Sequence, residues 1–182
     1  MEKIILDDKE ITIRKLAASD LKNARKFANY INNLIEEDVY LTADKKYSLK
    51  QEAEFLKIQI EKIKKKNSVF LVAEKEKKVI GVASIERMSG KQGHIGLFGI
   101  SIAREWRGLG LGLGTRLIGK IFDMAKKDFE PSIKMITLDV IADNKPAFSL
   151  YRKMGFEEVA VLPRYFQHKG GLLDIIVMNL YL

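Results

Sequence analysis

The stretch Ala103-Arg-Glu-Trp-Arg-Gly-Leu-Gly-Leu-Gly-Leu-Gly-Thr-Arg-Leu117 decides the fold of this chain. It places glycines at four alternate positions, from Gly108 to Gly114, after an apolar run over 95–102 and before a helical pattern of apolar residues over 117–125. The order is therefore strand, glycine loop, helix. Glycine lets a ligand approach the backbone closely, and the first N–H groups of a helix favour an anion. The stretch predicts a phosphate-binding turn.

Other phosphate-binding loops have different spacings. A dinucleotide fingerprint has the form Gly-x-Gly-x-x-Gly, and a Walker loop ends in Gly-Lys-Ser/Thr. The strictly alternating glycines match neither, because Thr115 follows Gly114 with no lysine between them. The alternative interpretation is a glycine-rich turn that only lets the helix pack tightly on the strand. Four glycines headed by Arg107 favour the phosphate-binding turn.

The rest of the chain indicates a mixed α/β fold in one domain over residues 1–182. Its early strands suggest an antiparallel meander, and the middle of the chain has a strand–helix–strand order with a right-handed crossover. Ser19 or Asp20 is expected to cap the first helix, and Ser48 with Gln51 resembles a capping box. The expected strands cover 11–16, 68–73, 79–85, 94–102, 134–141, 156–162 and 173–181, and the expected helices cover 21–34, 48–65, 114–127 and 145–154.

Composition excludes several classes of protein. The 182 residues contain no cysteine and two histidines, so disulfides, a cysteine nucleophile and a metal site are not expected. No apolar run is long enough to cross a membrane. The only apolar run near the N-terminus, Ile4-Ile-Leu6, is followed at once by charged residues, so no secretory signal is visible and a cytoplasmic location is expected. The net charge of +8 suits nucleic acid or an anionic cofactor. Its lysine clusters lack interleaved aromatics, which favours solvated faces over a nucleic-acid partner.

Two motifs now resemble one family. Arg107-Gly-Leu-Gly-Leu-Gly112 resembles the Gln/Arg-x-x-Gly-x-Gly/Ala signature of the GNAT superfamily of acetyl-CoA-dependent N-acetyltransferases. Leu138-Asp-Val-Ile-Ala-Asp-Asn-Lys-Pro-Ala-Phe-Ser-Leu-Tyr-Arg-Lys-Met-Gly-Phe156 resembles its later motif, Asn-x-x-Ala-x-x-x-Tyr-x-Lys-x-Gly-Phe. The resemblance covers the chain from about Val69 onward. It implies a GNAT-type fold with a mostly antiparallel central sheet, splayed between the fourth and fifth strands and flanked by about four helices.

The resemblance also implies where acetyl-CoA binds. Its pantetheine arm would lie along strand residues Gly99, Ile100, Ser101 and Ile102. The pyrophosphate would bind the loop and the helix start, namely Arg107, Gly108, Leu109, Gly110, Leu111, Gly112, Gly114 and Thr115. The loop departs from the family pattern by an apparent extra Leu-Gly, so the contacting run is either 108/110/112 or 110/112/114. The Thr115 hydroxyl either adds a contact or is an ordinary helix residue. Asn144 is expected to cap the helix that follows it. The resemblance implies, in addition, a hydrogen bond from its side chain to the cofactor.

Catalytic roles follow from the same resemblance. Tyr151 matches the family's general acid, which protonates the departing CoA thiolate after direct attack by an amine; its alternative role is core packing. Glu86 and His94, at strand ends, are the candidate bases. The family's acid position falls near Gly96, which has no side chain. Either candidate base is equally an ordinary surface residue at a hairpin end.

The resemblance implies a small-molecule or peptide amine as the acceptor, and it is compatible with a homodimer. The loop after the first helix carries Glu36, Glu37, Asp38 and Tyr40, which would suit a cationic amine or would simply be solvated. Tyr165 and His168 are expected to border the acceptor pocket. The rival function is a degenerate sensor that binds acetyl-CoA without turnover.

Overall fold

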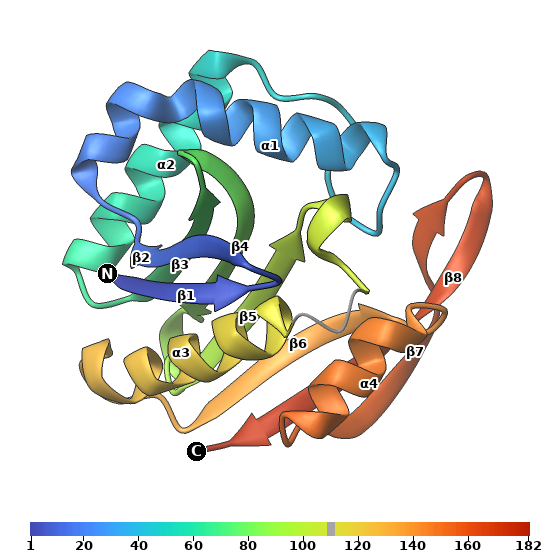
Figure 1. Ribbon diagram of the computed structural model, residues 1–182. Helices are drawn as coiled ribbons and strands as arrows, with labels where there is room; N and C mark the ends of the chain where they lie inside the picture. Colours follow the sequence, from blue (N-terminus) through green and yellow to red (C-terminus); the bar gives the residue numbers. More distant parts are fainter. Residues whose placement is uncertain (109–111) are drawn as a thin grey trace.

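The computed structural model describes residues 1–108 and 112–182. Eight strands form one sheet in the order β1-β2-β3-β4-β5-β6-β8-β7 (Figure 1). The strands are β1 (Glu2–Leu6), β2 (Lys9–Lys15), β3 (Ser68–Lys75), β4 (Lys78–Arg87), β5 (Ile95–Ile102), β6 (Met135–Ile141), β7 (Glu157–His168) and β8 (Gly171–Tyr181). The α-helices are α1 (Ala24–Glu36), α2 (Leu49–Lys64), α3 (Leu113–Asp128) and α4 (Lys145–Lys153).

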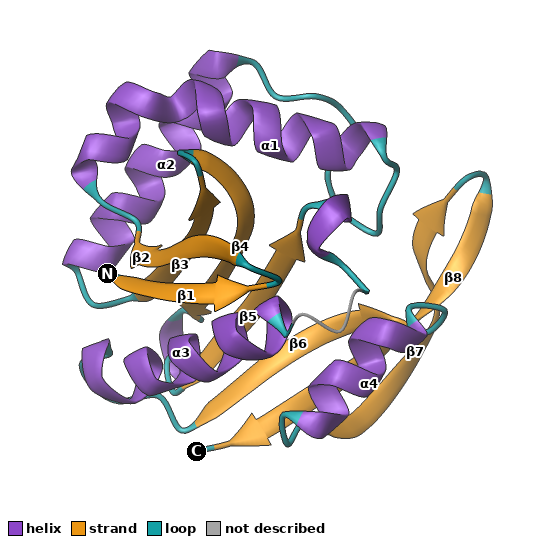
Figure 2. Cartoon of the chain, in the orientation of Figure 1, coloured by secondary structure: helices purple, strands orange, loops and turns teal. Residues whose placement is uncertain are grey.

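Helices cover both faces of this sheet, and the central strand β3 shows why (Figure 2). Every residue from Ser68 to Ala73 is buried. Because strand side chains alternate between faces, Phe70 and Val72 pack in the cluster with α1 and α2, while Val69 and Leu71 pack in the cluster with α3. A continuous apolar run is thus what a strand between two helical layers requires.

The sheet separates where β5 meets β6, as the family resemblance predicts. These are the fourth and fifth strands of the sequence-based assignment, which lacked β1. They run parallel and pair only from Ile95–Met135 to Leu97–Thr137. Beyond that point β5 keeps its antiparallel partner β4 as far as Ile102, while β6 diverges toward β8. The mixed α/β fold and its splayed sheet are confirmed.

The structure differs from the sequence analysis in two ways near the N-terminus. The sequence analysis missed β1, which pairs with β2 through a tight turn at Asp7 and Asp8, both at positive φ. That turn lacks the glycine that usually marks a hairpin. The first helix is also not capped by Ser19 or Asp20, because a 3₁₀ segment over Ala18–Asn23 precedes α1. Asp20 instead turns inward to bind Arg14.

The predicted caps of α2 and α4 are present in the structure. The Ser48 hydroxyl accepts a hydrogen bond from the Gln51 N–H at the start of α2. The Asn144 side-chain oxygen accepts from the Ala147 N–H, 3.3 Å away, and so caps α4. Gly155 ends that segment at a φ of +93°, a left-handed conformation that favours glycine. These caps fix where α4 begins and ends along the sheet.

We predict that Gly96→Ala lowers the free energy of unfolding by about 1–3 kcal/mol, because this position of β5 is tightly packed. An added Cβ would lie 2.5 Å from Ile85 Cγ2 and 2.9 Å from Ile133 Cδ1. The control is Gly99→Ala on the same strand, where the nearest atom is the Ser84 hydroxyl at 3.8 Å. Urea denaturation of both variants is the measurement. Equal stabilities would contradict the close packing around Gly96.

Candidate active site

A cleft with a volume of about 620 Å³ opens beside the separated part of β5. Four segments line it: the end of α1 with the loop after it, the end of β5, the glycine loop with the first turn of α3, and α4. The lining residues are Leu34, Val39, Tyr40, Leu41, Ile100, Ser101, Ile102, Trp106, Arg107, Gly108, Gly112, Leu113, Gly114, Thr115, Asn144, Pro146, Ala147, Leu150, Tyr151 and Lys153. The fold therefore gathers segments more than 100 residues apart around one space.

Most of the predicted acetyl-CoA contacts line this cleft. They are Ile100, Ser101, Ile102, Arg107, Gly108, Gly112, Gly114, Thr115, Asn144 and Tyr151. Leu109, Gly110 and Leu111 lie outside the described residues, so the predicted contacts there, and the choice between the two glycine registers, stay predictions. The motif around Arg107 and the motif around Tyr151 thus face each other across a single cleft.

The anion-binding end of the cleft is the N-terminus of α3. Gly112 caps this helix at a φ of +76°, and its carbonyl accepts the first intrahelical bond, from the Arg116 N–H at 2.9 Å. The N–H groups of the first turn have no acceptor within a helix. Those of Leu113, Gly114 and Thr115 belong to residues that line the cleft. Unpaired donors at the positive end of a helix dipole suit a phosphate.

Tyr151, on α4, also lines the cleft. Its ring is buried and makes edge contacts with Phe98 and Phe156, with ring centroids 6.1 and 6.0 Å away. Burial raises the pKa of Tyr151 to about 12. The phenol therefore keeps its proton across the physiological range. The two interpretations of Tyr151 are compatible, because the ring packs in the core while the residue also lines the cleft.

Sequence reasoning missed two polar contacts that α1 makes with the cleft. The buried Tyr30 hydroxyl lies 2.9 Å from the Ser101 hydroxyl of β5, and burial raises the Tyr30 pKa well above its usual value. Arg107 forms an ion pair with Glu37, the C-cap residue of α1. In the sequence, Tyr30 is not distinguished from the other buried residues of this helix. No local pattern links residues that are about 70 positions apart in the chain.

The structure does not bring the two candidate bases to this cleft. Glu86 faces α2 and forms an ion pair with Lys62. His94 is exposed and precedes β5 at the end away from the cleft. Ile100 lies six positions after His94 along the strand, a distance of roughly 20 Å. Gly96, where the family's acid position falls, is packed into the core. Their assignment as bases has no support from geometry.

The acidic residues after α1 are not free side chains. Glu36 pairs with Lys46, Glu37 with Arg107, and Asp38 with the β7–β8 turn. In that turn, Lys169 Nζ lies 3.1 Å and His168 Nδ1 3.6 Å from the Asp38 carboxylate. The His168 ring also lies 5.0 Å from that of Tyr40, a residue of the cleft wall. His168 thus contacts a residue of the cleft wall, whereas Tyr165 is 67% exposed. Neither is itself a lining residue, and their place at the acceptor pocket stays a prediction.

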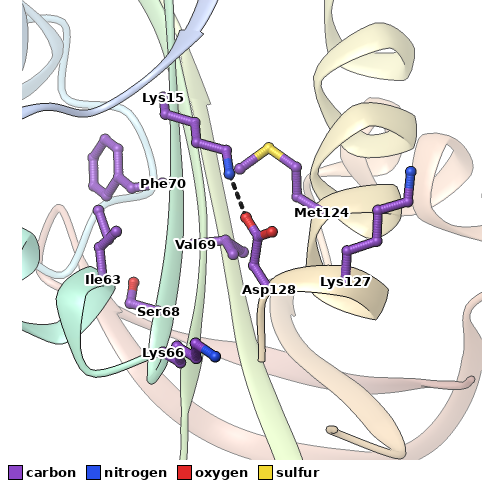
Figure 3. Close-up of a pocket in the computed structure, with 9 residues that line it drawn as sticks. All are labelled: Lys15, Ile63, Lys66, Ser68, Val69, Phe70, Met124, Lys127 and Asp128. Atoms are coloured by element: carbon purple, nitrogen blue, oxygen red, sulfur yellow. Dashed lines mark hydrogen bonds and ion pairs between the residues drawn. The ribbon is translucent and has the colours of Figure 1, made fainter. Parts of the chain in front are cut away.

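A second, smaller cavity of about 250 Å³ lies between the C-terminal ends of α2 and α3 (Figure 3). Its wall combines apolar side chains with Lys15, Lys66 and Lys127. Two of these cations are already neutralised, Lys15 by Asp128 at 2.6 Å and Lys66 by Glu130. The cavity holds none of the predicted site residues. The chemistry of this chain is therefore expected in the larger cleft.

A family model described as the acetyltransferase (GNAT) family matches residues 32–156, which include both motifs. This chain belongs to the GNAT acetyltransferase family. It is 29% identical over 118 residues to an N-alpha-acetyltransferase of Sulfurisphaera tokodaii, a match that covers 59% of this chain and 67% of the relative. It is 39% identical over 62 residues to an uncharacterized protein of Mycobacterium leprae, of which it spans only 16%.

Solved structures of GNAT proteins share the fold. A GNAT acetyltransferase of Streptococcus pneumoniae superposes with a TM-score of 0.81 at 23% identity, covering 95% of this chain and 100% of that one. A putative acetyltransferase of Salmonella typhimurium, solved with its cofactor acetyl-CoA, superposes with a TM-score of 0.78 at 18% identity, covering 94% and 93%. Both similarities concern the fold.

Two further observations concern the described residues of this GNAT protein. None of its helices is long and apolar enough to span a bilayer. Across residues 1–108 and 112–182, no group of three or more His, Asp or Glu side chains is arranged to hold a metal ion.

Proposed function

We propose that this GNAT protein transfers the acetyl group of acetyl-CoA to a primary amine, with the α-amino group of a peptide or amino acid as the preferred acceptor. The observation that carries the proposal is the cleft itself. It joins the N–H groups of the first turn of α3, the edge of β5 that β6 does not pair and the Tyr151 side chain in one space. Membership of the acetyltransferase family and the N-alpha-acetyltransferase relative support this reaction.

The residues of the cleft fit acetyl-CoA in order along its length. The first turn of α3 and Arg107 would bind the diphosphate, and β5 from Ile100 to Ile102 would pair with the pantetheine arm through backbone groups that β6 leaves unpaired. The Asn144 side chain uses its oxygen to cap α4, which leaves its amide N–H groups for the cofactor. The thioester would then lie between the end of β5 and Tyr151.

The chemistry requires no covalent intermediate on the protein. The neutral amine nitrogen attacks the thioester carbonyl carbon, the carbon–sulfur bond breaks, and Tyr151 donates its proton to the departing thiolate. The proton that the nitrogen loses on forming the amide passes through water and restores the phenol of Tyr151. Backbone N–H groups on the open edge of β5 would stabilise negative charge on the carbonyl oxygen. Holding both reactants in one cleft supplies a further part of the rate.

The acceptor side of the cleft is the loop after α1. Its wall there consists of Leu34, Val39, Tyr40 and Leu41, which are apolar or aromatic. The neighbouring acids already have cationic partners. A multiply charged polyamine would therefore find few free carboxylates, whereas an α-amino group on an apolar chain end would match the wall. The single-domain organisation, the cytoplasmic location, the homodimer and the lack of a nucleic-acid partner stay predictions.

A binding experiment and a turnover experiment together test this function. Trp106 is the only tryptophan of the chain and lines the cleft, so we expect its fluorescence to change on titration with CoA. We also expect release of free CoA thiol from acetyl-CoA when amino-acid amides and short peptides are supplied. Binding of CoA without turnover on any amine would favour the sensor. If CoA does not bind, both functions are wrong.

A further inference from the structure

The ion pair between Arg107 and Glu37 joins the cofactor side of the cleft to its acceptor side. Arg107 Nη2 donates to the Glu37 carboxylate, and the two side chains are 37% and 23% exposed. Arg107 precedes the glycine loop and lines the cleft. Glu37 ends α1, between the cleft-lining residues Leu34 and Val39. The pair therefore bridges two segments that are expected to contact different substrates.

Glu37 occupies an electrostatically unfavourable position on its own helix. It caps the C-terminus of α1, where the helix dipole disfavours anions. Glu36 and Asp38, on either side, already have the cationic partners Lys46 and Lys169. Arg107, in turn, lies a few residues before the N-terminus of α3, the end at which an anion is favoured. Each member of the pair thus compensates for a charge that its own surroundings do not balance.

Arg107 also has binding capacity that Glu37 does not use. Its Nε is buried and has no hydrogen-bond partner within the part of the chain that the structure describes. A guanidinium carries five N–H donors in a planar fork, which suits a phosphate with several free oxygens. A diphosphate seated on the first turn of α3 would offer such oxygens beside Arg107. Within the described residues, Glu37 therefore does not satisfy every donor of Arg107.

We propose that Glu37 is an internal competitor for the diphosphate of acetyl-CoA. In this structure its carboxylate binds Arg107, and on cofactor binding Arg107 transfers to the diphosphate. Glu37 then becomes an unpaired carboxylate on the acceptor side of the cleft, where it can hold the ammonium group of the incoming amine. The proposal rests on the proposed function, and it makes the cofactor the first substrate to bind. Glu37 is a substrate-binding residue in this scheme, because it contacts the amine, whose nitrogen must lose a proton before it attacks the thioester.

The test is the direction in which Glu37→Gln changes the affinity for CoA. If Glu37 competes with the diphosphate, the variant binds CoA about threefold to fivefold more tightly than the wild type, the range expected for a partly exposed ion pair. Pantetheine, which lacks the diphosphate, binds both proteins equally. Glu37→Asp has a shorter side chain that reaches Arg107 poorly, and it shows the same tightening. Fluorescence of Trp106 or calorimetry gives each dissociation constant.

The matched control is Glu36→Gln. It removes the neighbouring carboxylate, which forms an ion pair with the exposed Lys46 outside the cleft. It leaves the affinity for CoA unchanged. Weaker binding of CoA by Glu37→Gln would show that Glu37 only holds Arg107 in place for the phosphate, and unchanged binding would show that the pair survives in the complex. Either result would contradict the proposal that Glu37 competes with the diphosphate for Arg107. Failure of the wild type to bind CoA would instead count against the proposed function.

Discussion

Replacing Tyr151 by phenylalanine is expected to lower kcat by about 10²- to 10⁴-fold, the usual contribution of a positioned general acid. The ring keeps its contacts with Phe98 and Phe156, so the fold and the KM for acetyl-CoA should change little. Steady-state kinetics based on thiol release gives both parameters. A loss confined to kcat is the signature of a group that acts only in the transition state.

The pH dependence of the wild type provides a second check on Tyr151. Because burial raises its pKa to about 12, the phenol stays protonated well above neutral pH. Its loss as a proton donor should therefore not limit kcat below roughly pH 11. The matched control is Tyr165→Phe, which removes a hydroxyl from a 67% exposed ring outside the cleft and should leave kcat unchanged. Full activity of Tyr151→Phe would refute the general-acid assignment.

Local pattern explains why the cofactor side of the cleft was predictable. The glycines at 108–114 must join a strand to a helix, and Asn144 and Gly155 must begin and end α4. Each requirement lies within one short segment. The packing then follows, because the apolar faces of α3 and α4 bury against the same side of the sheet.

Contacts between distant segments explain what was not predictable. The pairs Tyr30–Ser101 and Glu37–Arg107 join α1 to residues about 70 positions later. No periodicity marks such a partner, so the sequence left the acidic residues after the first helix as either an amine-binding surface or solvated side chains and did not show that their charges are paired. The position of the two candidate bases relative to the cleft was unpredictable for a related reason. Strand ends can be read from sequence, but which end faces the cleft depends on where β5 and β6 separate.

A buried charge cluster, also unseen in the sequence, holds the N-terminal part of the sheet to α1. Arg14 on β2 binds Asp20 through two hydrogen bonds of 2.7 and 2.8 Å and Glu74 on β3 through two of 2.8 and 2.9 Å. Lys26 on α1 lies 2.5 Å from Glu74 and 3.5 Å from Asp20. Two cations and two anions thus balance. Asp20 is only 2% exposed, so water can replace little of what its partners supply.

Asp20→Asn is expected to lower the free energy of unfolding by about 3–5 kcal/mol, because it leaves a partly buried positive charge uncompensated. Urea denaturation at neutral pH measures the loss. The control is Asp7→Asn, which removes an exposed carboxylate 3.4 Å from Lys9 and should cost less than about 1 kcal/mol. Equal losses in the two variants would contradict a structural role for the cluster.

The stability difference between wild type and Asp20→Asn should depend on pH in a defined direction. Burial by itself would raise the pKa of Asp20, but the hydrogen bonds from Arg14 and the Ala17 N–H, together with the charges of Arg14 and Lys26, outweigh it and hold the pKa below the ordinary value of 3.8. A group whose folded-state pKa is lowered contributes its full stability above the unfolded value and loses it as the pH falls through the folded one. The difference should therefore be constant above about pH 5 and shrink below about pH 4. A difference that grew on acidification would mean that Asp20 is protonated in the native protein.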